Sequence, residues 1–390
     1  MKKIVIAIDS FKGSVSSAEA NKYCAEGVRQ VFPDCEIMQV PVSDGGEGFA
    51  EAMACTMNSD IREVTVHGPL GNKTNAKYFF DRASRTAIME MAQACGLTLV
   101  PEDRRNPLLA SSFGTGEMIL DAIRLGAEEI IIGLGGSATN DGGIGMLTAL
   151  GIRFLDASGN TLPGIASDMS RIHDIDLSGM YTELMHTKFT VACDVQNPLL
   201  GPAGATLTFG AQKGADKDML ESMEKGMRNL VAQTAKINLP DTEYIPGAGA
   251  AGGLGFALMS YLNASLRHGI DIILDANRFG EIIRDASLVI TGEGSLDAQT
   301  CNGKTAHGIL CKAKDYNIPV IAISGQIKDY EDISRIGFMS LTSIINKPMS
   351  LQYSMQHNTT KNNITQTIIQ LLNIIKYYTS PSQTQAMYMK

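Results

Sequence analysis

Tryptophan is absent from the 390-residue chain, and histidine is scarce, with six residues. The sequence contains no H-x-x-x-H pair and no Cys/His cluster, so nothing in it indicates a zinc site. Its seven cysteines form no C-x-x-C pair and are odd in number, which fits reduced thiols better than a disulfide framework. A G-x-S-x-G nucleophile elbow is also missing, which weakens covalent alternatives.

Long apolar runs and basic blocks are missing as well. No uninterrupted apolar stretch approaches the roughly 18 residues of a membrane span. The first residues, MKKIVIAIDS, begin like a signal peptide, but the apolar run ends too early, at Asp9. Lys and Arg total 33 against 41 Asp and Glu, which gives a formal charge of −8 and a pI near 5.3. We therefore expect a cytoplasmic protein with no nucleic-acid or membrane partner, although a local basic pocket could still hold one small anion.

Glycine is what the sequence has in excess, with 39 residues against 13 prolines. This is about one and a half times the average glycine share. The glycines show no three-residue period, which excludes collagen. A hydrophobic content of 44% is enough for a large aliphatic core and excludes general disorder. The length predicts two or three domains at roughly 150 residues each.

Strands and helices alternate at both ends of the chain, a pattern that predicts a parallel sheet with crossover helices. At the N-terminus we expect strands at 3–9 and 36–42 and helices at 16–32 and 45–57, the first helix opened by a capping box of Ser16 and Glu19. The pattern returns with strands at 288–291, 319–324 and 339–345 and helices at 305–315 and 362–376.

The middle of the chain has a different pattern. Segments 63–67, 74–81 and 85–91 predict an antiparallel meander. They are followed by helices at 115–125, 143–151 and 216–235 and strands at 128–133 and 188–194. We therefore expect a doubly wound α/β domain made of residues 1–65 and 266–390, with a mixed α/β domain of residues 66–265 inserted into it.

A large share of the glycines gather in six short patches, four of which closely follow predicted strands. The first, DSFKGS (9–14), carries Lys12 in front of a helix, which is a natural anion site beyond the end of a parallel strand. An ordinary loop with an exposed lysine is an equal alternative. In the second, SDGGEG (43–48), Asp44 and Glu47 could hold a hydrated Mg²⁺. Helix capping is the alternative there, but it leaves the three glycines unexplained.

The third patch, GLGGSATNDGG (133–143), is the strongest signal from the residues alone. Its five glycines would let backbone N–H groups approach a phosphate without Cβ clashes. Ser137, Thr139 and Asn140 add short hydrogen-bonding side chains, and Asp141 adds a carboxylate. This composition predicts a phosphate cradle.

The fourth patch, which runs from Cys193 through Gly201 and Gly204 to Gly214, and the fifth patch are less specific. Asp194 ends a predicted strand, a common place for a catalytic or metal-binding carboxylate and equally for a turn. Lys213 is either a second anion contact or a structural residue. The fifth patch, GAGAAGG (247–253), matches the dinucleotide fingerprint G-x-G-x-x-G. No strand is predicted before it, so a close-packed helix start is favoured over NAD binding.

The sixth patch, TGEGSLD (291–297) with GKT (303–305), has the order of a P-loop, but the required glycine is replaced by Ala298. A true P-loop is therefore disfavoured. Glu293 and Asp297 bracket a strand end, which is typical of a Mg²⁺ ligand or a proton acceptor, and Lys304 could neutralise phosphate. The six patches together favour phosphoryl transfer, which depends on positioning and charge stabilisation.

These motifs resemble the type-1 glycerate kinases of bacteria, in the family's order and over about residues 1–325. The matching stretches are DSFKGS, VSDGGEG, GLGGSATNDGG, ACDVQNPLLGPAGA, FGAQKGA, PGAGAAGGLGFAL and ITGEGSLDAQTCNGKT. The resemblance implies ATP- and Mg²⁺-dependent phosphorylation of D-glycerate to 2-phosphoglycerate. It also implies two α/β domains, one Rossmann-like, with the site in the cleft between them. The chain departs from the family at Ala211, where proline is usual, and after about residue 347.

The resemblance supports these positions as motif members without assigning roles among them. Our hypothesis is that Asp194 orients or deprotonates the glycerate hydroxyl, and that Lys12 offsets phosphate charge. The candidate metal ligands are Asp44, Glu293 and Asp297. The candidate substrate ligands are Ser10, Asn197 and Asp141. The candidate ATP ligands are Gly135, Gly136, Ser137, Asn140 and Lys304.

Three alternatives stay open at this point. The protein could phosphorylate another small hydroxy acid, or it could be a dinucleotide-binding oxidoreductase, which the fifth patch alone supports. It could also be a ligand sensor without activity. The oligomeric state is not readable from the sequence, so a homodimer stays open.

Overall fold

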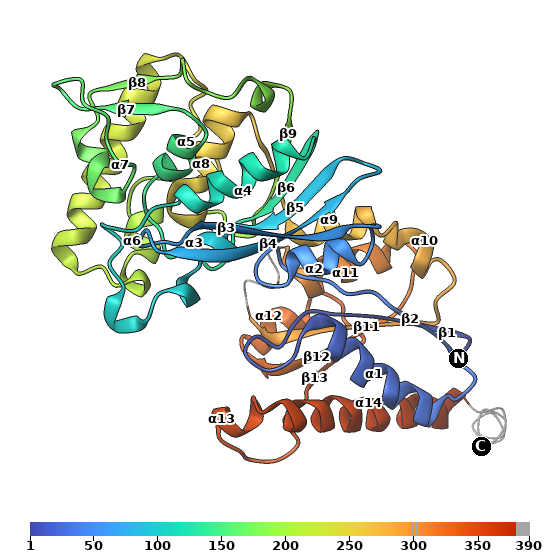
Figure 1. The fold of residues 1–390 in the computed structure, drawn as a ribbon. Helices are drawn as coiled ribbons and strands as arrows, with labels where there is room; N and C mark the ends of the chain where they lie inside the picture. The colour runs from blue at the N-terminus through green and yellow to red at the C-terminus, as the bar shows by residue number, and fades with distance from the viewer. Residues whose placement is uncertain (298–299, 301–302, 380–390) are drawn as a thin grey trace. The chain divides into compact units, whose positions relative to one another are not determined.

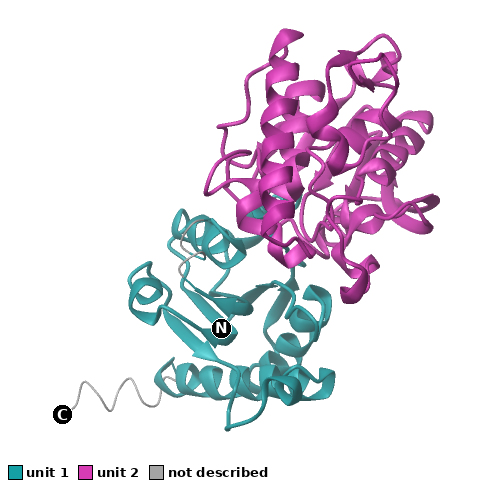
Figure 2. Ribbon diagram, turned by 90° about the vertical axis from the view of Figure 1, so that its left-hand side faces the viewer, with its two compact units in different colours: residues 1–44, 270–390 teal, residues 45–269 magenta. Residues whose placement is uncertain are grey.

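The computed structural model describes residues 1–297, 300 and 303–379. Contacts within the chain divide it into unit 1, residues 1–44 and 270–390, and unit 2, residues 45–269 (Figure 2). Residues 45–65 thus group with unit 2, whereas the sequence analysis assigned them to the domain built from the chain ends. That the two units are separate domains with the expected bounds stays a prediction.

Unit 1 is built on a five-stranded sheet in which every pair of neighbouring strands is parallel. Its order is β13-β12-β11-β1-β2. The strands are β1 (Lys3–Ile8), β2 (Glu36–Gln39), β11 (Leu288–Leu296), β12 (Val320–Ile327) and β13 (Ser340–Ser343). Counted along the chain, this is the order 2-1-3-4-5, one of the two common doubly wound orders. Its topological switch point lies between β1 and β11.

Helices cover both faces of this sheet. They are α1 (Ser17–Val31), α9 (Gly269–Ala276), α10 (Phe279–Ile283), α11 (Thr305–Lys314), α12 (Tyr330–Ser334), α13 (Leu351–Ser354) and α14 (His357–Thr379). The helices α1 and α14 lie side by side and share one apolar core with β1, β11 and β12 (Figure 1). Residues of α11 and α12 form a smaller core with β11 and β12. The predicted capping box of Ser16 and Glu19 is confirmed at the start of α1.

Unit 2 contains a six-stranded mixed sheet in the order β10-β9-β6-β5-β4-β3. The predicted meander is confirmed, because β3 (Asp60–His67), β4 (Lys73–Asp81) and β5 (Thr86–Glu90) pair antiparallel. The parallel part follows with β6 (Glu129–Gly133), β9 (Lys188–Ala192) and β10 (Ser265–Arg267). A separate pair is formed by β7 (Arg153–Leu155) and β8 (Asp174–Asp176).

The helices of unit 2 pack around this sheet (Figure 1). The α-helices are α2 (Phe49–Ala54), α3 (Ala92–Cys95), α4 (Phe113–Arg124), α5 (Ile144–Ala149), α6 (Ala205–Phe209), α7 (Lys217–Lys236) and α8 (Ala250–Leu262). The 3₁₀ helices are η1 (Leu97–Leu99), η2 (Glu102–Arg104), η3 (Ala166–Arg171), η4 (Thr182–Met185) and η5 (Ala211–Lys213). Within the described residues, no helix is long and apolar enough to cross a membrane.

The helix expected at 45–57 is shorter in the structure, because α2 begins only at Phe49. Gly45 and Gly48 both have φ of +86°, in the left-handed region that a regular helix does not use. The glycines of the second patch therefore form a loop, and the helix starts after them.

The fifth glycine patch packs against the third. A Cβ added to Gly252 would lie 2.1 Å from the carbonyl oxygen of Thr139, and one added to Gly253 would lie 2.7 Å from the Cα of Gly142. No strand precedes α8 among residues 238–249, so the context of a dinucleotide fingerprint is missing. The close-packed helix start expected from the sequence is confirmed.

We predict that Gly252→Ala lowers the free energy of unfolding by about 2 kcal/mol more than Gly126→Ala does. Both glycines have positive φ, but nothing lies within 4 Å of a Cβ at Gly126, so this control carries backbone strain alone. At Gly252 the strain is joined by overpacking, which typically costs about 1–3 kcal/mol. Chemical unfolding followed by circular dichroism measures the difference. Equal losses in the two variants would contradict the packing argument.

Candidate functional site

Acidic side chains of unit 1 gather where three of its parallel strands end. Asp9 follows β1, Asp44 comes after β2, and Glu293 lies in β11 one residue beyond the last residue paired with β1. The carboxyl ends of parallel strands meet at one edge of a sheet, and ligands bind there at the topological switch point. In addition to burial, the charge of Asp44 raises the pKa of Asp9, and the charges of Asp9 and Asp44 raise the pKa of Glu293, so the three carboxylates lie within electrostatic reach of one another.

Asp9 is the most tightly held of these acids. It is buried, and its Oδ2 accepts a hydrogen bond of 2.9 Å from the hydroxyl of Thr305, the first residue of α11. Its Oδ1 accepts a 2.6 Å bond from the backbone N–H of Ser10. Burial, followed by the charge of Asp44, raises the pKa of Asp9 to about 7. The sequence analysis did not single out this residue, although its position directly after the first strand is a usable signal.

Glu293 is also buried, and its negative charge is only partly offset by neighbouring groups. Burial and then the charge of Asp9 raise its pKa to about 8, although Lys304 opposes the shift. Its Oε1 is buried and accepts no hydrogen bond from the described residues. An orphaned carboxylate oxygen beside further acids leaves negative charge that a bound cation would offset.

Two lysines supply positive charge to the same cluster. The Nζ of Lys12 lies 2.9 Å from Oδ2 of Asp44. Burial lowers the pKa of Lys12, but the charge of Asp44 and the hydrogen bond to it bring the pKa above its ordinary value. The Nζ of Lys304 lies 3.8 Å from Oδ1 of Asp297. The structure therefore brings together the two lysines with the three carboxylates predicted as metal ligands, and adds Asp9 to them.

Among the described residues, no group of three or more His, Cys, Asp or Glu side chains is arranged to hold a metal ion. Mg²⁺ does not require such a group, because it usually takes one or two carboxylates together with phosphate oxygens and water. The acid cluster fits that chemistry. Part of the sixth patch, residues 298, 299, 301 and 302, lies outside the described residues.

In unit 2, the third glycine patch encloses a buried lysine. The Nζ of Lys213 donates hydrogen bonds of 2.8 Å to Oγ of Ser137 and 2.7 Å to the carbonyl oxygen of Thr139. Burial, opposed by the charge of Asp141, lowers the pKa of Lys213 to about 7. Two charges that the sequence analysis considered separately, Lys213 and Asp141, thus interact.

Several candidate residues of this patch have internal partners. Asp141 is fully buried and accepts bonds from the backbone N–H groups of Ser112, Gly143 and Gly145, so it holds the starts of α4 and α5 together. Asn140 is also buried, and its Nδ2 donates to Oγ1 of Thr206. These contacts assign structural roles to both side chains. The burial of Asp141 and Asn140 is explained without a ligand, and their predicted contacts with substrate and ATP stay predictions.

Backbone packing accounts for one of the two glycines predicted to bind ATP. A Cβ added to Gly135 would lie 2.5 Å from the Cα of Gly46, so the second and third patches approach closely here. Gly136 has φ of +69°. Phosphate contact by either residue stays a prediction.

Asp194 lies beyond the end of β9 and is tied to the segment after β10. Its Oδ1 accepts a 3.1 Å bond from the backbone N–H of Gly269 and lies 3.2 Å from Nδ1 of His268. The sequence analysis missed His268, which no local motif marks. Asn197 makes separate contacts, with its Nδ2 donating to the carbonyl oxygen of Ala203. Ser10 carries a buried hydroxyl that has no hydrogen-bond partner among the described residues.

This parallel α/β fold, with acids and lysines at the switch point of its sheet, is typical of proteins that bind phosphorylated small molecules. Comparison with known proteins is more specific. A model of the glycerate kinase family matches residues 4–376. The chain belongs to the glycerate kinase family.

Individual relatives cover nearly the whole chain. It is 46% identical to the glycerate kinase of Bacillus subtilis (strain 168), across 91% of this chain and 93% of that protein. It is also 46% identical to the glycerate 2-kinase of Escherichia coli (strain K12), across 84% and 86%. A crystal structure from Salmonella typhimurium LT2, of a protein provisionally named glycerate kinase 2, superposes with a TM-score of 0.85 at 41% identity, covering 96% and 98% of the two chains. These matches confirm the resemblance seen in the motifs and the expected enzyme class.

We predict that Asp9→Asn stabilises the ligand-free protein increasingly as the pH rises from about 4 to 7. The raised pKa means that folded Asp9 keeps its proton between pH 3.8 and about 7 while the unfolded chain has released it. The folded state then binds more protons, so wild-type stability falls through this window and the cost is complete above it. The variant escapes a cost on the order of 2–4 kcal/mol.

Chemical unfolding at several pH values, without Mg²⁺ or nucleotide, measures this effect. Asp34→Asn serves as the control, because Asp34 is an exposed carboxylate of the same unit. A stability difference between Asp9→Asn and wild type that does not change with pH would contradict the burial of an ionisable group at this position.

Proposed function

We propose that this protein transfers the γ-phosphoryl group of ATP to D-glycerate and releases 2-phosphoglycerate. Membership of the glycerate kinase family supports the acceptor, and the name of the Escherichia coli relative, glycerate 2-kinase, supports the product. The observation that carries the proposal is the cluster of acids and lysines at the switch point of the unit 1 sheet.

The charges of this cluster suit a nucleotide phosphate bound with a divalent cation. We assign Asp44, Glu293 and Asp297 to hold Mg²⁺, directly or through water. A bound Mg²⁺ would neutralise charge that develops on the phosphate oxygens. Lys12 and Lys304 would pair with those oxygens as point charges, as lysines commonly do at phosphate sites.

The reacting hydroxyl needs a group that orients it or accepts its proton. We assign this role to Asp194, a carboxylate whose position is set by the backbone N–H of Gly269. The adjacent Nδ1 of His268 is a second partner that restricts its orientation. Proton transfer by a positioned side chain is typically worth about 10²–10⁴-fold in rate.

We predict that purified protein with ATP, Mg²⁺ and D-glycerate releases ADP in a coupled assay. Lys12→Ala and Asp194→Asn should each lower kcat by about 100-fold or more, because each removes charge or proton transfer at the reaction. Lys22→Ala and Asp218→Asn are matched controls at exposed positions and should retain wild-type rates.

The same assay tests the acceptor and the product. A panel of small hydroxy acids distinguishes D-glycerate from other acceptors, and ³¹P NMR distinguishes 2-phosphoglycerate from 3-phosphoglycerate. If wild-type turnover of D-glycerate does not exceed that of the Lys12→Ala, Asp194→Asn double variant, the proposed function is wrong.

A further inference from the structure

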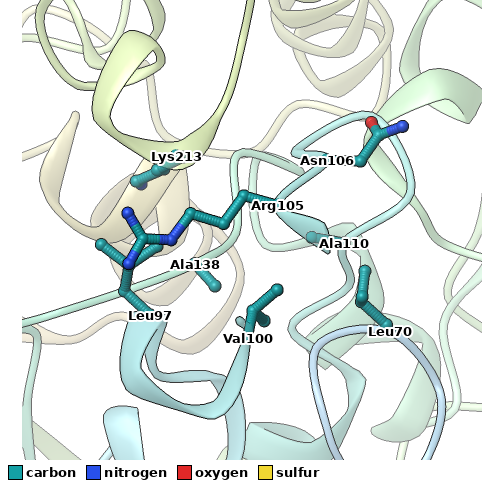
Figure 3. A pocket seen from close by; sticks show the side chains of 8 residues that line it. All are labelled: Leu70, Leu97, Val100, Arg105, Asn106, Ala110, Ala138 and Lys213. Carbon is teal, nitrogen blue, oxygen red and sulfur yellow. The ribbon is translucent and has the colours of Figure 1, made fainter. Parts of the chain in front are cut away.

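Two cations of unit 2, Arg105 and Lys213, lie beside a small space that is lined mostly by apolar side chains (Figure 3). The space has no room for a water molecule, so it cannot admit a substrate or a nucleotide. Lys213 is held there by its hydrogen bonds to Ser137 and Thr139. The sequence left two interpretations of Lys213 open, and this packing favours the structural one.

In unit 1, Lys12 lies at the tip of a tight turn whose two ends are buried. The backbone nitrogen of Phe11 lies 3.0 Å from the carbonyl oxygen of Val15, and the nitrogen of Val15 lies 3.1 Å from the carbonyl oxygen of Phe11. Both side chains belong to the apolar core that α1 and α14 share. The turn closes through Gly13, whose φ is +75°. The ends of the turn are therefore fixed in the core, while Lys12 extends from its tip.

This turn lies against the strand that carries Glu293. A Cβ added to Gly294, the next residue of β11, would lie 3.7 Å from the Cα of Phe11 and 3.8 Å from the backbone nitrogen of Lys12. The ammonium of Lys12 reaches Asp44 from there. A lysine side chain is a flexible stem that carries a point charge. The place of this charge in the acid cluster therefore depends on where the turn holds the backbone.

Residues near the start of α14 contact the tip of the turn. The Oγ of Ser14 lies 2.6 Å from the Oγ1 of Thr360, a buried residue of α14. The hydroxyl of Thr360 donates its own proton to the carbonyl oxygen of Ser354, at 2.9 Å, so Ser14 is the donor in the bond between the two hydroxyls. Met355 adds an apolar contact, because its Cε would lie 2.9 Å from a Cβ at Gly13.

No motif in the sequence marks these contacts, since the stretches quoted above end at residue 305. A buried hydroxyl costs free energy unless it is hydrogen-bonded, and the bonds that satisfy Thr360 link the turn to the end of α13. We propose that Thr360 is a positioning residue for Lys12, which it holds in place through the hydroxyl of Ser14. The inference rests on the proposed function, in which Lys12 pairs with phosphate oxygens, and deepens it by naming the contact that places this charge.

Calorimetric titration of ADP with Mg²⁺ into Thr360→Val and Ser14→Ala tests the inference. Each variant removes the bond between the two hydroxyls, and a bond of this kind is worth about 2- to 10-fold in an equilibrium constant. The Kd for ADP should rise by about that factor in both variants. Thr360→Ser keeps the hydroxyl and should stay close to wild type. Thr365→Val is the matched control and should also keep the wild-type Kd, because Thr365 donates a 3.1 Å bond from the same helix to the carbonyl oxygen of Tyr23 in α1.

A double-mutant cycle shows whether Thr360 acts through Lys12. Lys12→Ala alone should raise the Kd for ADP about 10-fold or more, because it removes a charge beside the phosphates. Adding Thr360→Val to Lys12→Ala should then have no further effect, since the charge that Thr360 positions is gone. An equal rise in Kd with and without Lys12 would mean that Thr360→Val only loosens the structure, and the inference would be wrong.

The outcomes separate this inference from the proposed function. If wild type turns over D-glycerate and neither Thr360→Val nor Ser14→Ala changes the Kd for ADP, the inference is wrong and the function stands. If ADP binding depends on Thr360 through Lys12 but D-glycerate is not phosphorylated, the proposed function fails and the inference is supported. If Lys12→Ala binds ADP as wild type does, Lys12 is no phosphate ligand and the inference is wrong. Ser14→Ala alone decides the matter if Thr360→Val does not fold.

Discussion

The crowding of carboxylates at one edge of the unit 1 sheet is the constraint on which the rest of the account depends. Asp9 and Glu293 are buried among further acids, and burial raises the pKa of Asp9 to about 7 and that of Glu293 to about 8. A fold that keeps such groups together without full compensation gives up stability at neutral pH. The arrangement is explained if a divalent cation and phosphate complete it, which is the chemistry that we propose for this protein.

In unit 2 the main constraint is the close packing of loops against one another. The glycine patches of this unit meet backbone to backbone, as Gly252 does at Thr139 and Gly135 does at Gly46. These contacts bring the loops after the parallel strands close together. Lys213 and Asp141 are buried in the same unit. The glycine excess in unit 2 therefore reflects loop packing as much as ligand approach, whereas the sequence analysis related most of it to phosphate.

Local sequence patterns predicted most of the fold. The capping box at Ser16 and Glu19, the meander of β3 to β5 and the parallel strands of both chain ends depend on neighbouring residues, so the sequence predicts them. The very short strands β7, β8 and β10 leave no such pattern. Asp9 was missed because its environment is set by Thr305, a residue far along the chain that no local pattern connects with it. A charged residue whose pKa is changed only by burial in the folded protein cannot be recognised from the spacing of residues in the sequence.

The most direct test of the acid cluster is calorimetric titration of ADP into wild type and Glu293→Gln, with Mg²⁺ and with EDTA. If Glu293 helps to hold the cation beside the phosphates, Mg²⁺ should tighten ADP binding to wild type by about 10-fold or more, a difference of roughly 1.4 kcal/mol, and most of that gain should be lost in the variant. An equal effect of Mg²⁺ on both proteins, or no effect on either, would contradict the account of this cluster as a cation and phosphate site.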